Sequence, residues 1–135
     1  MKSIPDGYVT NTGMDPAEDY VGPFYHRSHA NGYNSVFVPS AKNCNLNGDV
    51  HGGVLMTFAD FALCVTATNN YEDESCTSIS FNCDFVSSGK EGELIECTPT
   101  ITRKTGSMVF LTGTLTSSGE ALMTFSSVVK RLRPG

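Results

Sequence analysis

The sequence predicts an α+β domain in which an antiparallel sheet of five to six strands wraps around one long central helix. Two observations lead to this class. The stretch from Gly53 to about Asn69 is apolar on nearly all sides, and four extended segments separated by turn signals follow it. Because an apolar helix must be covered on most of its surface, we expect the sheet to curve around it.

The chain has 135 residues, a length that fits one domain with one core. We expect residues 1–22 to form a polar N-terminal segment and residues 23–135 to form the single domain. Short strands are predicted over 24–27 and 33–38, around a turn at 29–32. The Asn-rich stretch 39–49 is predicted to be a loop.

The long helix should begin at Gly53 and stop at the pair Asn69-Asn70. Asp60 is its only charged residue. A carboxylate inside an apolar helix needs a partner, a water-filled cleft or a narrow exposed strip. Thr57 and Thr68 lie roughly on its side, so an exposed strip is one interpretation and a chemical role is the other.

The segment after the helix alternates with period two, which indicates a strand. Its apolar face would carry Ile79, Phe81, Cys83 and Phe85. Three further strands are expected over 94–102, 108–116 and 121–132, in an antiparallel meander whose turns contain glycine. Pro99 cannot donate to a ladder, which indicates an edge position or a bulge there.

Composition argues against several classes of function. The formal net charge is -5, and no cluster of Lys and Arg is dense enough to follow a phosphate backbone, so we expect no nucleic-acid partner. Residues 1–20 lack the apolar run of a signal peptide, and Asp60 interrupts the longest apolar stretch. We therefore expect a cytoplasmic protein without a membrane partner.

The cysteines are odd in number and contain no Cys-x-x-Cys pair, which disfavours disulfide and metal sites. Core filling is the expected role of Cys44, Cys64, Cys76, Cys83 and Cys97. No metal site is predicted.

One stretch carries specific chemistry. The pattern Asn45-x-x-Gly48-x-x-His51-Gly52-Gly53, followed by Asp60 in an apolar helix, resembles the signature of the phenylacetyl-CoA-type thioesterases, which are hotdog-fold enzymes. The resemblance extends over roughly residues 24–132, although only these sixteen or so residues are specific. It implies a hotdog fold and hydrolysis of an acyl-CoA thioester to a free acid and CoA, with no cofactor beyond the CoA of the substrate.

The residues at the helix start suit that reaction. A thioester carbonyl under attack gains negative charge and needs hydrogen-bond donors already aimed at it, and the first N–H groups of a helix are such donors. Gly52 and Gly53 lack Cβ, so a ligand can approach their backbone closely. The alternatives are that the glycines only form a tight entrance to the helix, and that His51 is a capping or buried histidine.

Helix geometry predicts that residues from two chains are needed to form one site. Eight residues at about 1.5 Å each separate Gly52 from Asp60 by roughly 12 Å, too far for one reaction centre. Both can act on one thioester only if a partner helix runs antiparallel, as in a two-fold dimer. The resemblance implies this homodimer, possibly within a tetramer.

The resemblance also assigns roles to individual residues. His51 and the Gly52 N–H would polarise the carbonyl, with Asn45 orienting the site, and Asp60 of the other subunit would act as general base or nucleophile. Ser78 would position the attacking water, or is only a polar strand residue. The CoA phosphates would meet a basic turn and the next loop, formed by Arg103, Lys104, Thr105, Gly106 and Lys90.

Two competing functions share these features. A hotdog hydroxyacyl dehydratase would need a different His and carboxylate motif, which this sequence does not contain. A non-catalytic protein that binds acyl-CoA or a hydrophobic ligand would use Asp60 only for structure. Aromatic, short and medium acyl groups are all compatible with the sequence.

Overall fold

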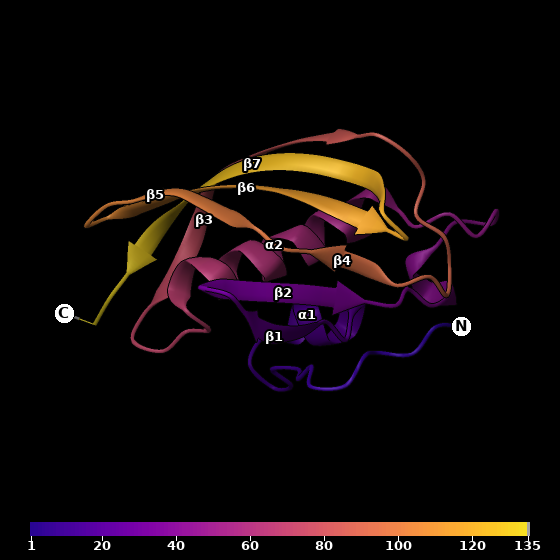
Figure 1. Cartoon of the computed structure of the whole chain (residues 1–135), viewed down its shortest axis with the longest axis horizontal. Helices are drawn as coiled ribbons and strands as arrows, with labels where there is room; N and C mark the ends of the chain where they lie inside the picture. The colour runs from indigo at the N-terminus through magenta and orange to yellow at the C-terminus, as the bar shows by residue number, and fades with distance from the viewer. Residues whose placement is uncertain (135) are drawn as a thin grey trace.

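The computed structural model describes residues 1–134, and one long helix is crossed by a curved sheet (Figure 1). The helical elements are α1 (Pro16–Val21), the short 3-10 turn η1 (Ala41–Asn43) and α2 (Gly52–Thr68). The strands are β1 (Tyr25–His29), β2 (Gly32–Phe37), β3 (Ser75–Phe85), β4 (Ile95–Cys97), β5 (Thr100–Lys104), β6 (Met108–Ser117) and β7 (Glu120–Leu132). This arrangement is the hotdog-like α+β fold that the sequence predicts.

The sheet contains seven antiparallel strands in the order β1-β2-β4-β6-β7-β3, and β5 pairs with β6. The expected sheet had five to six strands. The extra strand arises because one expected segment is divided at Pro99, whose missing N–H interrupts the ladder between β4 and β5. Beyond this break β5 keeps only β6 as its neighbour, so the predicted edge position at Pro99 is confirmed.

The predicted meander is wrong in one connection. β3, the first strand after α2, pairs with β7 along its whole length instead of lying beside β4. Alternation along a segment identifies a strand, but its neighbour depends on where the chain leaves the helix. Here β3 stands last in the strand order with β7 as its neighbour, so it is an edge strand.

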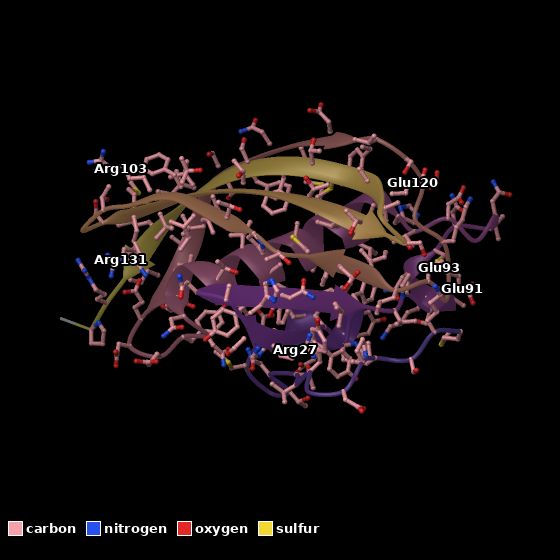
Figure 2. The ribbon with its side chains drawn as sticks, in the orientation of Figure 1. Arg27, Glu91, Glu93, Arg103, Glu120 and Arg131 are labelled. Atoms are coloured by element: carbon pink, nitrogen blue, oxygen red, sulfur yellow. The ribbon has the colours of Figure 1, made fainter. Side chains whose placement is uncertain are left out.

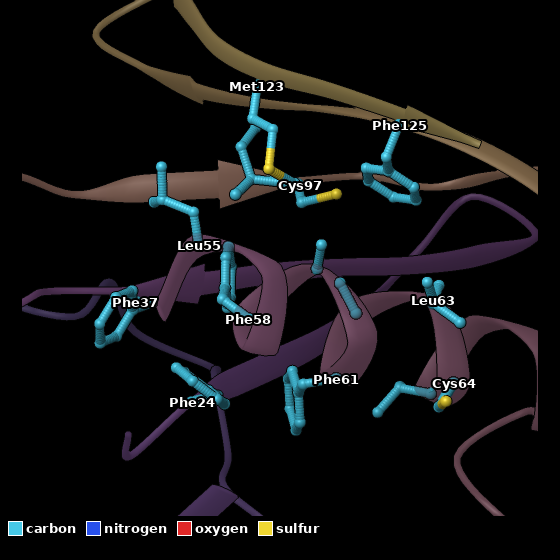
Figure 3. Close-up of a cluster of buried hydrophobic side chains, with 14 of the residues drawn as sticks. Phe24, Phe37, Leu55, Phe58, Phe61, Leu63, Cys64, Cys97, Met123 and Phe125 are labelled. Carbon is cyan, nitrogen blue, oxygen red and sulfur yellow. The ribbon is translucent and has the colours of Figure 1, made fainter. Parts of the chain in front are cut away.

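The helix α2 forms the centre of the core. Its limits, Gly52–Thr68, differ by one residue at each end from the predicted ones, and Asn69 ends it in the left-handed conformation. Figure 3 shows the two apolar sides of the helix. On one side, Phe58 and Phe61 of the helix pack with Phe24 and Phe37. On the other side, Leu55 of the helix faces Cys97 of β4 and Met123 of β7.

The alternation predicted for β3 is only partly correct. Phe81 and Cys83 are half-buried against the core, and Phe81 stacks on Phe125. Ile79 and Phe85 are 53% and 55% exposed, although the pattern placed them on the same face. A register irregularity between Ser78 and Ser80, the mark of a β-bulge, takes Ile79 out of the alternation. Phe85 keeps the period but is the last residue of β3, where its ring lies beside Gly52.

Residues 1–22 run along the outer side of β1. Val9 and His26 exchange two backbone hydrogen bonds of 2.9 and 2.8 Å, and His26 Nε2 lies 3.0 Å from Asn11 Oδ1. Asn11 also donates to Asn70, which ties the segment to the end of α2. The domain boundary at residue 23 stays a prediction.

Within the described residues 1–134, no helix is both long and apolar enough to cross a membrane. All five cysteines are thiols, with Cys64 and Cys97 buried and the other three half-buried. Core filling therefore holds for the two buried cysteines.

Candidate active site

Asp60 lies in the middle of α2 on the side that faces β3. Its carboxylate is half-buried and accepts a hydrogen bond of 2.7 Å from the Ser78 hydroxyl through Oδ1. The structure thus brings together Asp60 and Ser78, which are eighteen residues apart in the sequence. The bulge that follows Ser78 is of the kind that often re-aims side chains beside active sites.

The exposed strip suggested as an alternative for Asp60 is wrong for Thr68. Thr68 is buried and donates to the Cys64 carbonyl at 2.7 Å, while Thr57 donates to the Gly53 carbonyl at 2.9 Å. The open side of α2 instead carries Gly53, Met56 and Asp60, which follow one another at helical spacing. Asp60 is the one carboxylate of this side.

His51 and the two glycines form the start of α2. His51 is the exposed N-cap residue, and its carbonyl accepts from the N–H groups of Val54 and Leu55 at 3.0 and 3.1 Å. Gly52 and Gly53 are the first two residues of the helix. Because no helical turn precedes them, their N–H groups have no acceptor within the helix. These donors sit at the positive end of the helix dipole.

The two glycines have different surroundings. A Cβ at Gly52 would lie 2.9 Å from Cζ of Phe85, so the missing side chain makes room for the Phe85 ring of the same chain. A Cβ at Gly53 would meet no heavy atom of the described chain within 4 Å. The space beside the Cα of Gly52, where a ligand was expected to approach, is therefore occupied by the Phe85 ring. The space beside Gly53 is open.

Asn45 organises the loop that leads into α2. Its side-chain oxygen accepts from the N–H groups of Asn47 and Asp49 at 2.9 and 3.1 Å, and its own N–H donates to the Asp49 carbonyl. Lys90 forms an ion pair with Asp49 and remains largely exposed. Asn45 and Lys90 thus lie on two loops that meet near the start of α2.

The predicted basic turn lies at the other end of α2. Lys104 donates to the Ala67 carbonyl at 2.9 Å, Gly106 accepts from Arg133, and the Thr105 hydroxyl accepts from two N–H groups of its own turn. Arg103 is exposed. Figure 2 shows Arg103 and Arg131 at this end of the molecule and Glu91, Glu93 and Glu120 at the opposite end.

Arg131 contributes little free charge to that end. Its guanidinium is paired with Glu74 at 2.7 Å and also donates to the Thr105 carbonyl. The hydrogen bonds from Arg131 hold the pKa of Glu74 below its usual value. Arg103 is therefore the more available cation for an anionic ligand.

A residue that sequence reasoning missed is Glu18, on α1. Burial raises the pKa of its carboxyl to about 7, with smaller contributions from the charges of Asp15, Asp60 and Asp19. The packing of α1 against α2 places this carboxyl near Asp60. The acidic composition of residues 15–19 could have indicated a charged helix, but not that it lies beside Asp60.

The largest hollows of the surface lie elsewhere. One of ≈ 650 Å³ is lined mainly by threonines of β5, β6 and β7 together with His29, Asn34 and Glu96. It contains neither the start of α2 nor Asp60. We give more weight to Asp60 than to the size of this hollow, because Asp60 is hydrogen-bonded to Ser78 in the helix that the sequence singled out, whereas no side-chain hydrogen bond joins His29 or Glu96 to a neighbour in the part of the chain that the structure describes.

The fold and this site define a hotdog-like protein with a carboxylate on the open side of its helix. Over residues 47–124, more than half of the chain, the sequence matches the family described as the thioesterase superfamily, and the chain belongs to that family. The comparison with curated proteins gave no match.

Solved structures share the whole fold at low sequence identity. The PaaI protein of the Escherichia coli phenylacetic acid degradation operon has a TM-score of 0.77 and 15% identity, covering 90% of this chain and 86% of its own. A mutant of phenylacetic acid degradation protein PaaI from Thermus thermophilus has a TM-score of 0.74 and 22% identity, with coverages of 87% and 100%. A hypothetical thioesterase from Streptococcus pneumoniae, solved with coenzyme A, has a TM-score of 0.73 and 12% identity, with coverages of 82% and 91%.

Proposed function

We propose that this protein hydrolyses acyl-CoA thioesters, with Asp60 as the group that activates water or attacks the carbonyl. The observation that carries the proposal is the Asp60 carboxylate, which is held by Ser78 on the open side of α2 in a member of the thioesterase superfamily. The similar Streptococcus pneumoniae structure contains coenzyme A, which supports CoA as part of the substrate.

The proposed reaction uses Asp60 in the middle of α2 and the donors at the start of α2. Asp60 takes a proton from water, and the resulting hydroxide adds to the thioester carbon. Negative charge then develops on the carbonyl oxygen, where the Gly52 N–H and His51 donate hydrogen bonds. The C–S bond breaks, CoA leaves as a thiolate and the acid is released. If Asp60 attacks directly, the same donors stabilise the same oxygen.

These groups can meet only between two chains. The helix α2 is uninterrupted from Gly52 to Thr68, so the separation of roughly 12 Å between Gly52 and Asp60 along one helix stands. In a two-fold antiparallel pair, Gly52 of one chain lies opposite Asp60 of the other when the axis passes at residue 56, the midpoint. Met56 occupies that position and is 38% exposed in the single chain.

The charge distribution supports the same pairing. The basic turn lies at the C-terminal end of α2, far from Gly52 of its own chain, whose end of the molecule carries acidic loops. An antiparallel partner would bring its own Arg103 end toward that Gly52. The phosphates of CoA would then meet cations from one chain while the thioester meets donors from the other.

Substitution of Asp60 by Asn tests the reaction. Release of free thiol from aromatic, short and medium acyl-CoAs should fall by about 10²- to 10⁴-fold, because the base or nucleophile is lost. Asp73→Asn, which changes an exposed carboxylate outside the site, should keep full activity. Unchanged hydrolysis in D60N would contradict the role of Asp60, and no thiol release by the wild-type protein from any substrate would favour a binding protein.

Substitution of Met56 by Cys tests the pairing of helices. Two copies of this residue would lie at the axis, so mild oxidation should give a reducible covalent dimer in denaturing electrophoresis. Thr102→Cys, an exposed position on β5, and the wild-type chain are the controls and should remain single chains. A protein that is dimeric in sedimentation but does not cross-link at residue 56 would place the axis elsewhere.

A further inference from the structure

Two thiols lie beside the Asp60 carboxylate. Cys64 is on α2, one turn after Asp60, and its Sγ lies 4.0 Å from Asp60 Oδ1. Cys76 is on β3, two residues before Ser78. Because side chains two apart in a strand point to the same face, Cys76 projects from β3 on the same side as Ser78, which contacts Asp60.

The spacings of the helix and the strand match. From Asp60 to Cys64 the helix advances by about 6 Å, and from Ser78 back to Cys76 the strand covers about 6.7 Å. The two elements are consecutive along the chain and pack together, so these steps run in the same direction. Ser78 opposite Asp60 therefore implies Cys76 opposite Cys64.

The environments of the two thiols differ in a way that suits oxidation. Cys64 is 7% exposed, whereas Cys76 is half-buried and more accessible. The neighbouring Cys76 thiol and burial raise the pKa of the Cys64 thiol, so Cys64 stays protonated. Peroxide therefore reaches Cys76 first, and Cys64, opposite it, is placed to resolve the oxidised product.

We infer that Cys64 and Cys76 form a peroxide-sensitive dithiol site, which closes to a disulfide next to Asp60. The Cys76 thiol first loses its proton, and the thiolate attacks hydrogen peroxide, so that an S–O bond forms and the O–O bond breaks. The hydroxide that leaves takes up a proton equivalent to the one that the thiol lost, which gives a sulfenic acid and one water. The sulfur of Cys64 then attacks this sulfenic sulfur. The S–S bond forms, the S–O bond breaks, and the hydroxide that leaves takes the Cys64 proton as a second water.

Closure should disturb the Asp60 site. A disulfide requires Cβ atoms about 3.5–4.5 Å apart, so the start of β3 must be drawn toward α2 when the two thiols join. Ser78, two residues along the same strand, would shift against Asp60. A misplacement of about 1 Å can lower a rate by as much as 10²-fold, and this effect on hydrolysis rests on the proposed function.

Peptide mapping of the full-length protein tests the disulfide itself. After treatment with hydrogen peroxide and alkylation of the remaining thiols, cleavage after glutamate separates Cys64 from Cys76 at Glu72 and Glu74. Chymotrypsin separates Cys76 from Cys83 at Phe81. We expect a cross-linked Cys64–Cys76 peptide in the wild type and in Cys83→Ser, a matched control on β3, and its loss on reduction with dithiothreitol.

The single-cysteine variants sharpen the test. In Cys64→Ala the sulfenic acid on Cys76 should persist and react with a dimedone probe, and in Cys76→Ser no disulfide should form. A cross-link that joins Cys76 to Cys83 or Cys44 would overturn the inference. Oxidation of Cys76 beyond the sulfenic acid in the wild type, without any cross-link, would also overturn it.

Hydrolysis measured on the same samples separates the two proposals. Oxidation should lower thiol release from acyl-CoA by about tenfold in the wild type and in Cys83→Ser, reversibly, but not in Cys64→Ala. A full rate in disulfide-containing protein would contradict the coupling to Asp60. A reduced wild-type protein that hydrolyses no substrate would contradict the proposed function, while the peptide map would still decide the disulfide.

Discussion

The two ends of the strand order, β1 and β3, differ in whether another part of the chain covers them. At the β1 edge, residues 1–22 cover the strand: Val9 pairs with His26, and the Arg27 guanidinium lies 4.5 Å from the centre of the Tyr8 ring. At the opposite edge, β3 has β7 as its neighbour and exposes apolar side chains. Ile79 and Phe85 are each more than half exposed there.

An uncovered edge strand with exposed apolar residues invites another strand to pair with it, and proteins usually protect such edges. This chain protects the β1 edge with its own N-terminal segment. The unprotected β3 edge lies beside the open side of α2, where the proposed partner helix would pack. This contrast between the edges supports the proposed dimer and makes β3 the edge at which that proposal can be tested.

The largest effect is expected from a charge at the β3 edge. Ile79→Lys costs little in a single chain because Ile79 is 53% exposed, but in the dimer it would bury an unpaired ammonium. We expect monomeric protein and a fall in thiol release of about 10²-fold or more, since a loss of about 3 kcal/mol is typical of such burial. Sedimentation velocity and an acyl-CoA assay measure both effects.

The control for this substitution is Ile101→Lys on β5, where the isoleucine is 37% exposed. That variant should remain dimeric and active. If I79K is also dimeric and fully active, β3 is not the interface.

A smaller effect is expected at the β1 edge. Asn11→Ala leaves His26 Nε2 and the Asn70 oxygen without their present partner, so the free energy of unfolding should fall by about 1–3 kcal/mol. The oligomeric state and the rate of hydrolysis per folded protein should not change. Urea denaturation followed by fluorescence or circular dichroism gives the free energy of unfolding. A loss of the dimer in this variant would contradict the expectation that the β1 edge serves stability and the β3 edge serves pairing.

The same edge should carry a dependence of stability on pH. Burial lowers the pKa of His26 below the ordinary 6.5, so the folded state binds fewer protons than the unfolded state. The contribution of neutral His26 to the free energy of unfolding is complete above pH 6.5. It is lost as the pH falls through the pKa that His26 has in the folded state, which is the lower of the two. Between pH 7 and 5 the wild-type Tm should drop by a few degrees more than that of His26→Gln, in thermal unfolding scans.

A second dependence of stability on pH is expected at Glu18, beside Asp60. Its pKa is raised from 4.5 to about 7, so the folded state binds more protons, and stability is lost as the pH rises from about 4.5 through 7. Glu18→Gln should therefore raise the Tm by a few degrees at pH 8 and change it little at pH 4. An equal shift at both pH values would show that charge is not the cause.

Local patterns were sufficient for the long helix and most strands, but they did not predict α1. The apolar run with Asp60 inside it predicted α2 to within one residue at each end, because helix period and a terminal Asn are properties of neighbouring residues. Pro99 predicted an edge position or a bulge within one strand over 94–102, and the chain divides there into β4 and β5, since the missing N–H acts locally. The superfamily was likewise predicted, from the stretch that begins at Asn45.

Long-range packing decided the rest. The pairing of β3 with β7, the exposure of Ile79 and Phe85, and the closeness of Glu18 to Asp60 all depend on where distant segments meet. Likewise, the sequence suggested Lys104 as a phosphate ligand, whereas in the fold its ammonium also holds the last turn of α2 through Ala67.

Residue types and their spacing were enough to specify an apolar helix that carries one carboxylate and begins with two glycines, because these features follow from the chain's own order. The tertiary structure alone placed Ser78 on that carboxylate, packed β3 with its Cys76 against the helix and left the neighbouring sheet edge uncovered. Such contacts join residues whose separation in sequence says nothing about their separation in space, and so only the packed chain could establish them.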